Sequence, residues 1–325
     1  MVWIIFIITA VLIVLAATQL AKYGDIIAIR TRLGGMFIGL LLLAGATSLP
    51  EFLTTISSLS QNEPNLAAGN LMGSNTINMF LLAIIDLLNR NQRILRKAAL
   101  KHALTGSLTV LLIGLVVFFM LADIHLTIGW VGIDSLVIIG VYILSVRLIQ
   151  KTNSSPGSSQ EPEIPEDTPS LRRGIIGFLI ATAALIVVTP IMVECSNEIA
   201  VITGLGTTFI GTTLVALVTS LPELVTTLAA IKIGANDMAI GNLFGSNMFN
   251  MFAIGITDFF FTQGRFLSVI DPSFLLIGML GLLMTGFGLV GNLAKLERRI
   301  WFIELDVLAL ILIYFGGLWL LYSRI

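Results

Sequence analysis

Ten blocks of roughly 20 apolar residues follow one another along this chain of 325 residues. At a rise of about 1.5 Å per residue, a helix of that length crosses the hydrocarbon core of a bilayer. The blocks lack the alternation of membrane β-strands. The sequence therefore predicts an all-α polytopic membrane protein with ten transmembrane helices, near residues 2–21, 34–59, 66–88, 103–122, 128–149, 174–193, 205–230, 238–260, 269–291 and 301–322.

Composition supports this class of protein. Charged residues are only 11% of the chain, against about 25% in soluble domains. A formal net charge of -1 argues against nucleic-acid binding, and the lone Cys195 excludes a disulfide framework or a cysteine metal site. The first block lacks Lys and Arg, which favours a retained helix over a cleaved signal peptide.

The basic residues predict an orientation. With ten spans, 16 of the 18 Lys and Arg residues fall on one side of the membrane, leaving only Arg265 and Arg324 on the other. Because positive loops stay in the cytoplasm, we expect a multi-pass protein of the cell membrane, in contact with the lipid bilayer and with both termini outside the cytoplasm. A Pro-, Ser- and acid-rich cytoplasmic linker at 150–173 separates two five-helix halves, 1–149 and 174–325.

An internal repeat relates these halves. Thr-Ser-Leu-Pro-Glu occurs at 47–51 and 219–223, and Gly-Asn-Leu-Met/Phe-Gly-Ser-Asn at 69–75 and 241–247. Both pairs are 172 residues apart, and 54 ungapped positions around them contain 26 identities. Five predicted spans separate the copies, so the second copy crosses the membrane in the opposite sense. The sequence therefore predicts two inverted five-helix repeats, an arrangement found in many secondary transporters.

Glu51 and Glu223 lie near the middle of their predicted spans. A carboxylate at mid-membrane costs about 2.5–3.5 kcal/mol on insertion scales. No Lys or Arg lies mid-span to pair with either, so a mobile cation is the favoured partner. The alternative is two protonated glutamates within an internal hydrogen-bond network.

Prolines precede both glutamates, and polar residues follow in the next span. Pro50 and Pro222 remove helix hydrogen bonds, which frees backbone carbonyls of the same turn, including those of Thr47 and Thr219. In the next span, Asn, Ser and Asn recur every four residues and so share one helix face. They are Asn70, Ser74 and Asn78 in the first copy and Asn242, Ser246 and Asn250 in the second.

All of these candidate ligands are hard oxygens, which suit Na⁺, Ca²⁺ or Mg²⁺. Mg²⁺ gives up water reluctantly, so a dry cage favours Ca²⁺. Two glutamates balance the charge of one Ca²⁺, and Na⁺ or protons could replace it in turn. No nucleotide motif is present, so we expect exchange without a cofactor and without enzymatic activity.

The duplicated motifs resemble the α-repeats of the sodium/calcium exchanger branch of the cation/Ca²⁺ exchanger superfamily, in its minimal prokaryotic form. The resemblance implies Na⁺-driven Ca²⁺ exchange by alternating access, with two peripheral helices sliding against a core. It implies Ca²⁺ coordination by Glu51, Glu223 and the carbonyls of Thr47 and Thr219. Sodium sites would use Ser48, Ser74, Ser220 and Ser246 with the carbonyls of Ala44 and Ala216, and Asn78 and Asn250 would line the centre.

The second repeat departs from many sodium/calcium exchangers, which carry aspartate at the position of Asn250. This leaves the coupling ion and stoichiometry open. Proton-coupled relatives usually carry an acid within the Gly-Asn segment, and this chain has none there. The main alternative is a Ca²⁺/H⁺ or other cation antiporter, followed by a cation channel and an intramembrane hydrolase. The sequence leaves the oligomeric state open and is compatible with a monomer.

Three further polar groups were interpreted from position alone. Asp86 and Asp258 lie near span ends and are either at a mouth of the pathway or solvated. Asn75 and Asn247 are expected to point away from the site and to bond backbone between helices. His102 and His125 are expected in loops.

Overall fold

The computed structural model describes residues 1–31, 44–88, 99–153, 168–232, 236–294, 299–300 and 303–324. These form α-helices joined by short turns, one π-helix, η1 (Gly211–Val215), and two small hairpins. The helices are α1 (Val2–Thr31), α3 (Leu49–Ser60), α4 (Pro64–Leu88), α6 (Ala99–Ala122), α7 (Ile133–Asn153), α8 (Leu171–Thr203), α9 (Gly206–Ile210), α10 (Ala216–Thr219), α11 (Leu221–Lys232), α12 (Asn236–Phe260), α13 (Phe266–Val269), α14 (Phe274–Ala294) and α15 (Leu305–Tyr322).

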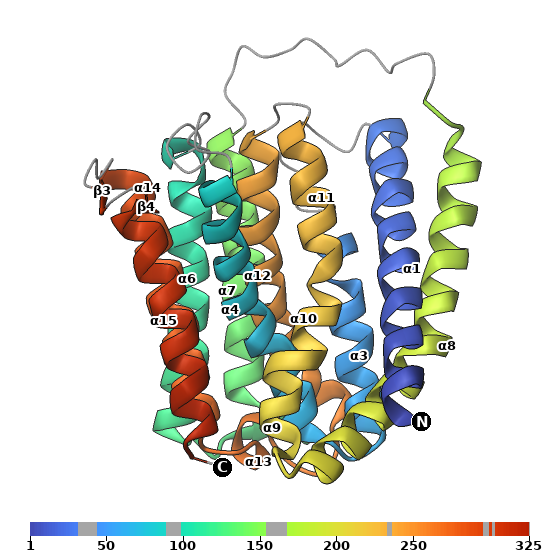
Figure 1. Cartoon of the computed structure of the whole chain (residues 1–325), viewed down its shortest axis with the longest axis vertical. Coiled ribbons are helices and arrows are strands. Elements are labelled where there is room, and N and C mark those ends of the chain that lie inside the picture. Colours follow the sequence, from blue (N-terminus) through green and yellow to red (C-terminus); the bar gives the residue numbers. More distant parts are fainter. Residues whose placement is uncertain are drawn as a thin grey trace.

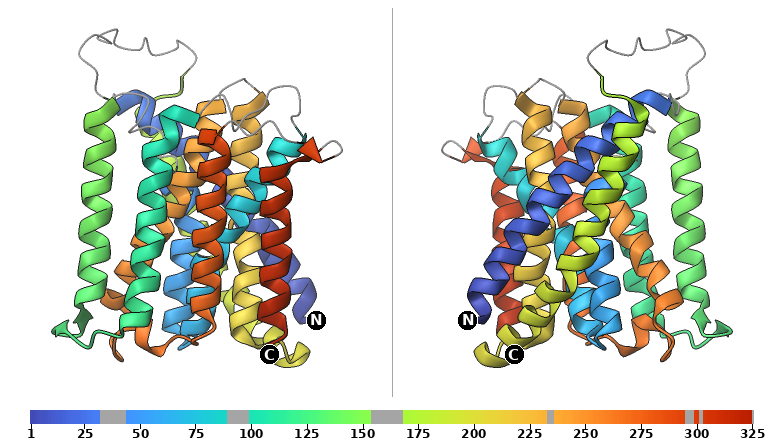
Figure 2. Two further views of the ribbon diagram at one scale, coloured as in Figure 1. Left: turned by 90° about the vertical axis from the view of Figure 1, so that its left-hand side faces the viewer. Right: turned by 90° about the vertical axis from the view of Figure 1, so that its right-hand side faces the viewer.

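The long helices form one bundle whose axes run roughly parallel (Figure 1). Helices α1 and α8 pack against each other at one edge and lean across the bundle (Figure 2). Helices α6, α14 and α15 lie toward the opposite edge, α7 lies at the back of the view behind α4 and α12, and α3, α4, α11 and α12 occupy the middle. Both chain termini lie at the same end of the bundle.

The helices have the length and surface of membrane spans. Among the described residues, six helices are long and apolar enough to cross a membrane, and two shorter apolar helices cover Phe274–Val290 and Asp306–Tyr322. Large apolar side chains face outward, with Ile180 and Trp319 each 66% exposed. Because bare hydrocarbon on this scale is stable only in lipid, the fold is that of a multi-pass membrane protein.

Element boundaries recur at the spacing of the sequence repeat. Adding 172 to the limits of α3, 49 and 60, gives the limits of α11, 221 and 232. The same sum takes α4 onto α12, and it takes hairpin β1 (Thr127–Ile128) with β2 (Val131–Gly132) onto β3 (Arg299–Ile300) with β4 (Ile303–Glu304). The structural repeat therefore extends well beyond the stretch with recognisable sequence identity.

Several predicted span limits were wrong. Helix α1 continues ten residues past the predicted end at 21, and α8 continues ten past 193. Both helices lean (Figure 2), and a tilted helix needs more residues to cross a bilayer. The last helix begins at Leu305, four residues after the predicted start at 301, because a hairpin precedes it. The helix before it begins at Phe274, five residues after the predicted start at 269, because the short α13 precedes it. Likewise, β1 and β2 occupy the start of the predicted span 128–149.

Other predictions fall partly outside the described residues. Positions 34–43 of the second predicted span, most of the linker at 150–173 and most of the basic cluster between the third and fourth spans lie there. His102 was wrongly placed in a loop: it lies in the first turn of α6 and is only 8% exposed. His125 does lie in a loop, between α6 and the first hairpin.

The turn between α3 and α4 packs against α8. Gln61 donates a hydrogen bond from Nε2 to the carbonyl of Pro190 at 3.1 Å, and Asn197 donates from Nδ2 to Glu63 Oε1 at 2.7 Å. Burial raises the pKa of the Glu63 carboxyl, and the bond from Asn197 opposes this shift. These bonds fasten one end of the α1–α8 pair to the centre of the bundle.

Candidate ion-binding site

Each Thr-Ser-Leu-Pro-Glu segment interrupts its helix instead of bending it. The chain leaves helical geometry at Ser48 and at Ser220, and new helices, α3 and α11, begin one residue later. Pro50 and Pro222 are the second residues of these helices, where a missing N–H is tolerated because no intrahelical acceptor awaits it. The glutamate therefore lies in the first turn of a helix that starts inside the bundle.

Backbone hydrogen bonds across the breaks do not use every carbonyl, and a threonine carbonyl is among those left aside in each repeat. Ser48 N–H bonds the carbonyl of Ala44 at 3.0 Å, and Ser220 N–H bonds that of Ala216 at 3.0 Å. Among the described residues, no backbone N–H bonds the Thr47 or Thr219 carbonyl across its break. These two carbonyls are the ones that the proline argument predicted to be available.

Glycines allow α4 to approach the backbone of the second repeat. A Cβ on Gly69 would lie 2.8 Å from the carbonyl carbon of Gly211, and one on Gly73 would lie 2.5 Å from the carbonyl oxygen of Thr212. This packing accounts for the position of Ser74, whose Oγ lies 3.5 Å from the Ala216 carbonyl oxygen and 3.5 Å from Thr219 Oγ1. Ser74 of the first repeat therefore contacts the helix break of the second repeat.

The breaks and the glycines together bury all the candidate ligands. Every one of the twelve residues has no exposed surface: Ala44, Thr47, Ser48, Glu51, Ser74, Asn78, Ala216, Thr219, Ser220, Glu223, Ser246 and Asn250. They come from the segment around Ser48 and from α3, α4, α10, α11 and α12, the central helices of Figure 1. The fold thus collects them in the interior, away from lipid.

Each glutamate is bonded by a serine of the other repeat. Ser48 donates to Glu223 Oε1 at 3.0 Å, and its counterpart Ser220 donates to Glu51 Oε1 at 3.5 Å. Since each serine lies three residues before the glutamate of its own repeat, these crossed bonds bring the two carboxylates together. Ser246 adds a bond to Glu223 Oε1 at 3.3 Å.

The threonines bond across the repeats in the same way. Thr47 donates from its hydroxyl to Asn242 Oδ1 at 3.4 Å, and Thr219 donates to Asn70 Oδ1 at 2.9 Å. Asn70 also donates to the backbone carbonyl of Glu51 at 2.7 Å. The recurrence of Asn, Ser and Asn on one helix face had indicated Asn70 and Asn242 as candidates. Only the structure shows that they form hydrogen bonds with the helix breaks.

Four buried oxygens at the centre have no hydrogen-bond donor among the described residues. Two belong to glutamates and two to asparagines, and each pair occupies equivalent positions in the two repeats. They are Glu51 Oε2, Glu223 Oε2, Asn78 Oδ1 and Asn250 Oδ1. A buried oxygen without a partner costs about 1–3 kcal/mol, more when it is charged. A protonated glutamate would also need an acceptor for its O–H. The described residues therefore leave the hydrogen-bond network open at these four oxygens, which are free to accept a cation.

Charge partners are also lacking within the described part of the chain. No Lys, Arg or His forms an ion pair with Glu51 or Glu223 there. Nor does any group of three or more His, Cys, Asp or Glu residues in those ranges have an arrangement that could hold a metal ion. The donor set consists of two carboxylates with neutral oxygens, which is the chemistry of hard cations and not of zinc or copper.

Two positional interpretations were wrong. Asn75 and Asn247 do not point away from the site: Asn247 Oδ1 accepts a hydrogen bond from Asn78 at 2.9 Å, and Asn75 Oδ1 accepts one from Asn250 at 3.1 Å. The predicted backbone bond exists for Asn247, whose Nδ2 donates to the Asn75 carbonyl at 3.2 Å. The sequence did contain a sign that these asparagines have a role, because Asn75 and Asn247 occupy equivalent positions in the two repeats, 172 residues apart.

Asp258 is neither solvated nor at a mouth of a pathway. It is 1% exposed and accepts bonds from Gly132 N–H, Ser135 Oγ and Phe266 N–H at 2.7–2.8 Å. It therefore joins α12 to the first hairpin and to α13. Its counterpart Asp86 is also buried, with 6% of its surface exposed.

A buried ion pair lies beside Asp258. Arg265 Nη2 is 3.0 Å from Asp134 Oδ2, and both side chains are at most 4% exposed. Arg265 was counted as a loop residue in the charge analysis, and it does follow α12 directly. Its charge is used within the protein, where it holds the start of α13 against the start of α7.

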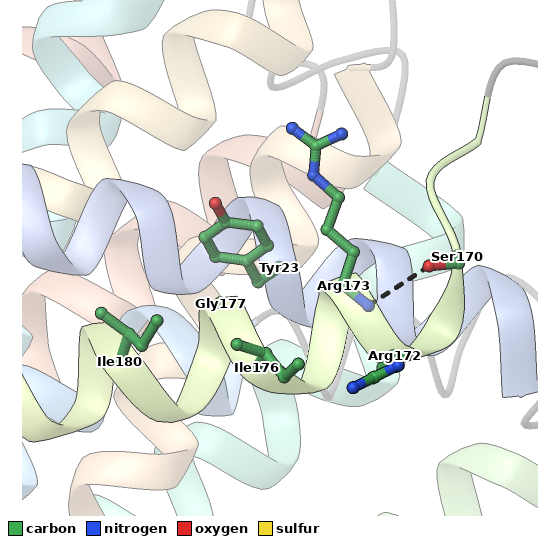
Figure 3. Close-up of a pocket in the computed structure, with 7 residues that line it drawn as sticks. All are labelled: Tyr23, Ser170, Arg172, Arg173, Ile176, Gly177 and Ile180. Atoms are coloured by element: carbon green, nitrogen blue, oxygen red, sulfur yellow. Dashed lines mark hydrogen bonds between the residues drawn. The ribbon is translucent and has the colours of Figure 1, made fainter.

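A separate pocket of about 310 Å³ opens between α1 and α8 (Figure 3). It is lined by Tyr23, Ser170, Arg172, Arg173, Ile176, Gly177 and Ile180, none of which is a candidate ligand. The hydroxyl of Ser170 accepts a bond from the Arg173 N–H and so caps α8. The pocket thus belongs to the edge of the bundle and not to the central site.

Comparison with known proteins identifies the family. The sequence model of the family described as sodium/calcium exchanger protein matches residues 1–150 and 173–323, nearly the whole chain. The chain therefore belongs to the sodium/calcium exchanger family, a family of ion exchangers, as its motifs predicted. It is 28% identical to the putative antiporter CaxA of Alkalimonas amylolytica over 257 residues, which cover 75% of this chain and 76% of that protein.

Solved structures share the fold. The H⁺/Ca²⁺ exchanger CAX superposes with a TM-score of 0.74 at 14% identity, covering 99% of this chain and 85% of that one. The sodium-calcium exchanger NCX_Mj, in crystals soaked with Na⁺ and Sr²⁺, gives a TM-score of 0.57 at 21% identity, covering 100% and 99%. At such identities the likeness establishes the fold and leaves the coupling ion open.

Proposed function

We propose that this protein is a secondary antiporter that exchanges Ca²⁺ for Na⁺ across the cell membrane by alternating access. The observation that carries the proposal is the central pair of buried glutamates. Each has an oxygen without a donor, and neither pairs with a basic residue in the described part of the chain. A transported cation supplies the missing charge.

The donor set fits Ca²⁺ in charge and in kind. The two carboxylates supply a charge of -2, and the Asn78 and Asn250 amide oxygens add neutral ligands. With the Thr47 and Thr219 carbonyls, the site approaches the six to eight oxygens that Ca²⁺ prefers. The serine hydroxyls that bond the glutamates in this structure are neutral oxygen ligands, which suit the singly charged Na⁺ that the exchange requires.

The coupling ion is proposed from the residues and not from the fold. Both repeats lack an acid in the Gly-Asn segment, and the family description names sodium. The structural likeness to an H⁺/Ca²⁺ exchanger favours proton coupling as the second candidate. Two carboxylates that release protons as Ca²⁺ enters would achieve it without further residues.

Alternating access rests on the inverted repeat. We propose ten transmembrane helices arranged as two five-helix repeats, 1–149 and 174–325, joined by a cytoplasmic linker, with both termini outside the cytoplasm. The recurrence of element limits at offset 172 and the position of both termini at one end support this arrangement. The crossed bonds between each glutamate and a serine of the other repeat support a site at the junction of the repeats, from which opposite movements would expose the ion to either side.

Ion flux into proteoliposomes tests the proposal. Vesicles holding the purified protein and loaded with Na⁺ should take up Ca²⁺ when Na⁺ is diluted outside. Glu51→Gln or Glu223→Gln should reduce uptake at least about 100-fold, because each removes one of two charges that bind Ca²⁺. Both variants should keep the thermal unfolding temperature within a few degrees of the wild type.

Each gradient is varied separately to assign the coupling ion. Uptake that follows the pH gradient and ignores Na⁺ would transfer the assignment to Ca²⁺/H⁺ exchange. Flux without any counter-ion, or single-channel currents, would indicate a channel. Normal uptake by either glutamine variant would contradict the site itself. Thr109→Val serves as the control, since Thr109 is buried but bonds only backbone carbonyls of α6 and α12.

A further inference from the structure

Four asparagines form a crossed arrangement within about one helical turn beyond Ser74 and Ser246. Asn75 and Asn78 lie on α4, and Asn247 and Asn250 lie on α12. All four are at most 1% exposed. Asn78 Nδ2 donates to Asn247 Oδ1 at 2.9 Å, and Asn250 Nδ2 donates to Asn75 Oδ1 at 3.1 Å. In each repeat, one asparagine therefore accepts a hydrogen bond from the side-chain amide of an asparagine in the other repeat.

These bonds determine which way two amides face. A side-chain amide has one end that donates and one that accepts. The Oδ1 atoms of Asn75 and Asn247 can only accept, so they select the NH₂ ends of Asn250 and Asn78. The carbonyl ends of Asn78 and Asn250 must then point elsewhere, and they are the oxygens that have no donor among the described residues. Turned around, the same amides would present N–H groups to a cation and repel it.

We infer that Asn75 and Asn247 are positioning residues that orient the Asn78 and Asn250 carbonyl oxygens toward the transported cation. The inference rests on the proposed function, because it takes those oxygens as cation ligands. Residues that orient metal ligands typically change affinity 10- to 100-fold when they are replaced. Neither Asn75 nor Asn247 needs to contact the cation for this effect.

The two positioning residues are not equivalent. Asn247 accepts from Asn78 and also donates from Nδ2 to the Asn75 backbone carbonyl at 3.2 Å, so its own orientation is fixed. Asn75 Nδ2 is buried without a hydrogen-bond acceptor in the described ranges. Asn75 is therefore held less firmly. Replacing Asn247 should weaken cation binding more than replacing Asn75.

The test compares Asn247→Leu with Asn247→Asp. Leucine has nearly the same size but cannot accept a hydrogen bond. The Asn78 amide therefore loses the hydrogen-bond acceptor that fixes its orientation. Aspartate keeps an acceptor for Asn78 Nδ2. Calcium and sodium binding to the purified full-length protein is measured by titration calorimetry. We expect Asn247→Leu to weaken Ca²⁺ binding 10- to 100-fold, Asn75→Leu to weaken it less, and Asn247→Asp to bind Ca²⁺ within a few-fold of the wild type.

A double-mutant cycle separates positioning from a general effect on packing. In protein that already carries Asn78→Ala, Asn247→Leu should cause little further loss of affinity, since the residue it orients is gone. Additive losses would overturn the inference, as would wild-type binding by Asn247→Leu. If Asn247→Leu fails to fold, Asn247→Thr, which keeps an acceptor, and Asn247→Val, which lacks one, provide the same comparison at smaller volume.

Two outcomes keep this inference apart from the proposed function. If the wild type binds Ca²⁺ or Na⁺ and Asn247→Leu binds equally well, only the positioning role fails. If the wild type binds neither ion, the proposed function and the positioning role fail together. Thr109→Val, at another buried contact of α12, should bind both ions as the wild type does.

Discussion

At the level of single residues, the repeat spacing indicated a set of side chains that the structure buries in the interior, and it was a poor guide to what they touch. Glu51 and Glu223 were singled out because an unpaired acid in a span needs a reason. Asn75 and Asn247 recur at the same spacing, yet they were expected to point away from the site. Their partners lie on the opposite repeat, and no pattern within one helix specifies which side chains of another helix it meets.

Asp258 gives a prediction at this scale. Asp258→Asn should lower the free energy of unfolding by about 2–3 kcal/mol, because the new NH₂ group would face the Gly132 N–H that the carboxylate now accepts. Thermal unfolding in detergent measures the loss. The exchange ratio of ions per cycle should stay unchanged, since Asp258 binds the hairpin and α13.

Asp271→Asn is the matched control for Asp258→Asn. Asp271 is exposed and accepts the Ser273 N–H, a role that asparagine performs equally well. If the Asp258→Asn variant were as stable as the wild type and exchanged a different number of ions per cycle, Asp258 would have to be assigned a role in transport.

At the level of elements, proline and glycine determine how the helices meet. The prolines were expected to remove helix hydrogen bonds, and each lies in the first turn of a new helix, which directs that helix's N-terminus into the bundle. The short π-helix η1 lies just before Ala216, and such bulges often accompany functional sites. Gly69 and Gly73 let α4 touch η1 backbone to backbone.

Gly73→Ala tests this contact. The added Cβ would lie 2.5 Å from the Thr212 carbonyl oxygen and 2.7 Å from its Cα, and backbone cannot move aside as a side chain can. We expect a loss of about 1–3 kcal/mol in the free energy of unfolding and a loss of most Ca²⁺ uptake. Thermal unfolding and vesicle flux measure the two effects.

Gly140→Ala is the matched control for Gly73→Ala. Gly140 lies in α7, and a Cβ there meets nothing within 4 Å. Alanine should be neutral or stabilise the helix by up to about 1 kcal/mol. If Gly73→Ala were as stable and active as Gly140→Ala, the close approach of α4 and η1 would not be needed for the site.

At the level of the whole molecule, the crossed bonds make the two repeats interdependent. Ser48, Thr47 and Asn78 bond the second repeat, and their counterparts bond the first. Neither repeat holds a complete set of partners for its own glutamate. The leaning α1–α8 pair packs along one side of this centre, where α1 contacts α10 and α11, α8 contacts α3, and the turn after α3 adds hydrogen bonds to α8.

The orientation of the chain is a prediction at this scale. In a Cys195→Ala background, Ser323→Cys places a thiol at the end of α15, and Thr152→Cys places one at the end of α7. Both positions are exposed and lie at opposite ends of the bundle (Figure 1). A membrane-impermeant maleimide applied to intact cells should label Ser323→Cys alone.

Inside-out vesicles provide the complement to intact cells. There the same reagent should label Thr152→Cys alone, because the positive-inside rule assigns that end of the bundle to the cytoplasm. The reverse pattern would place both termini in the cytoplasm. Labelling of both positions from one side would show an even number of crossings between them and would contradict the ten-span arrangement, which has five.

The sequence by itself determined the class of protein, the repeat at 172 and the twelve candidate ligands. The length of the apolar blocks, the acids without basic partners and the duplicated motifs can all be read from the order of residues alone. Only the tertiary structure decided which oxygens are left without donors, which asparagines hold which amides, and that Asp258 bonds a hairpin. Those properties depend on contacts between residues more than a hundred positions apart, and such contacts follow from how the two repeats pack and not from the order of residues in either one.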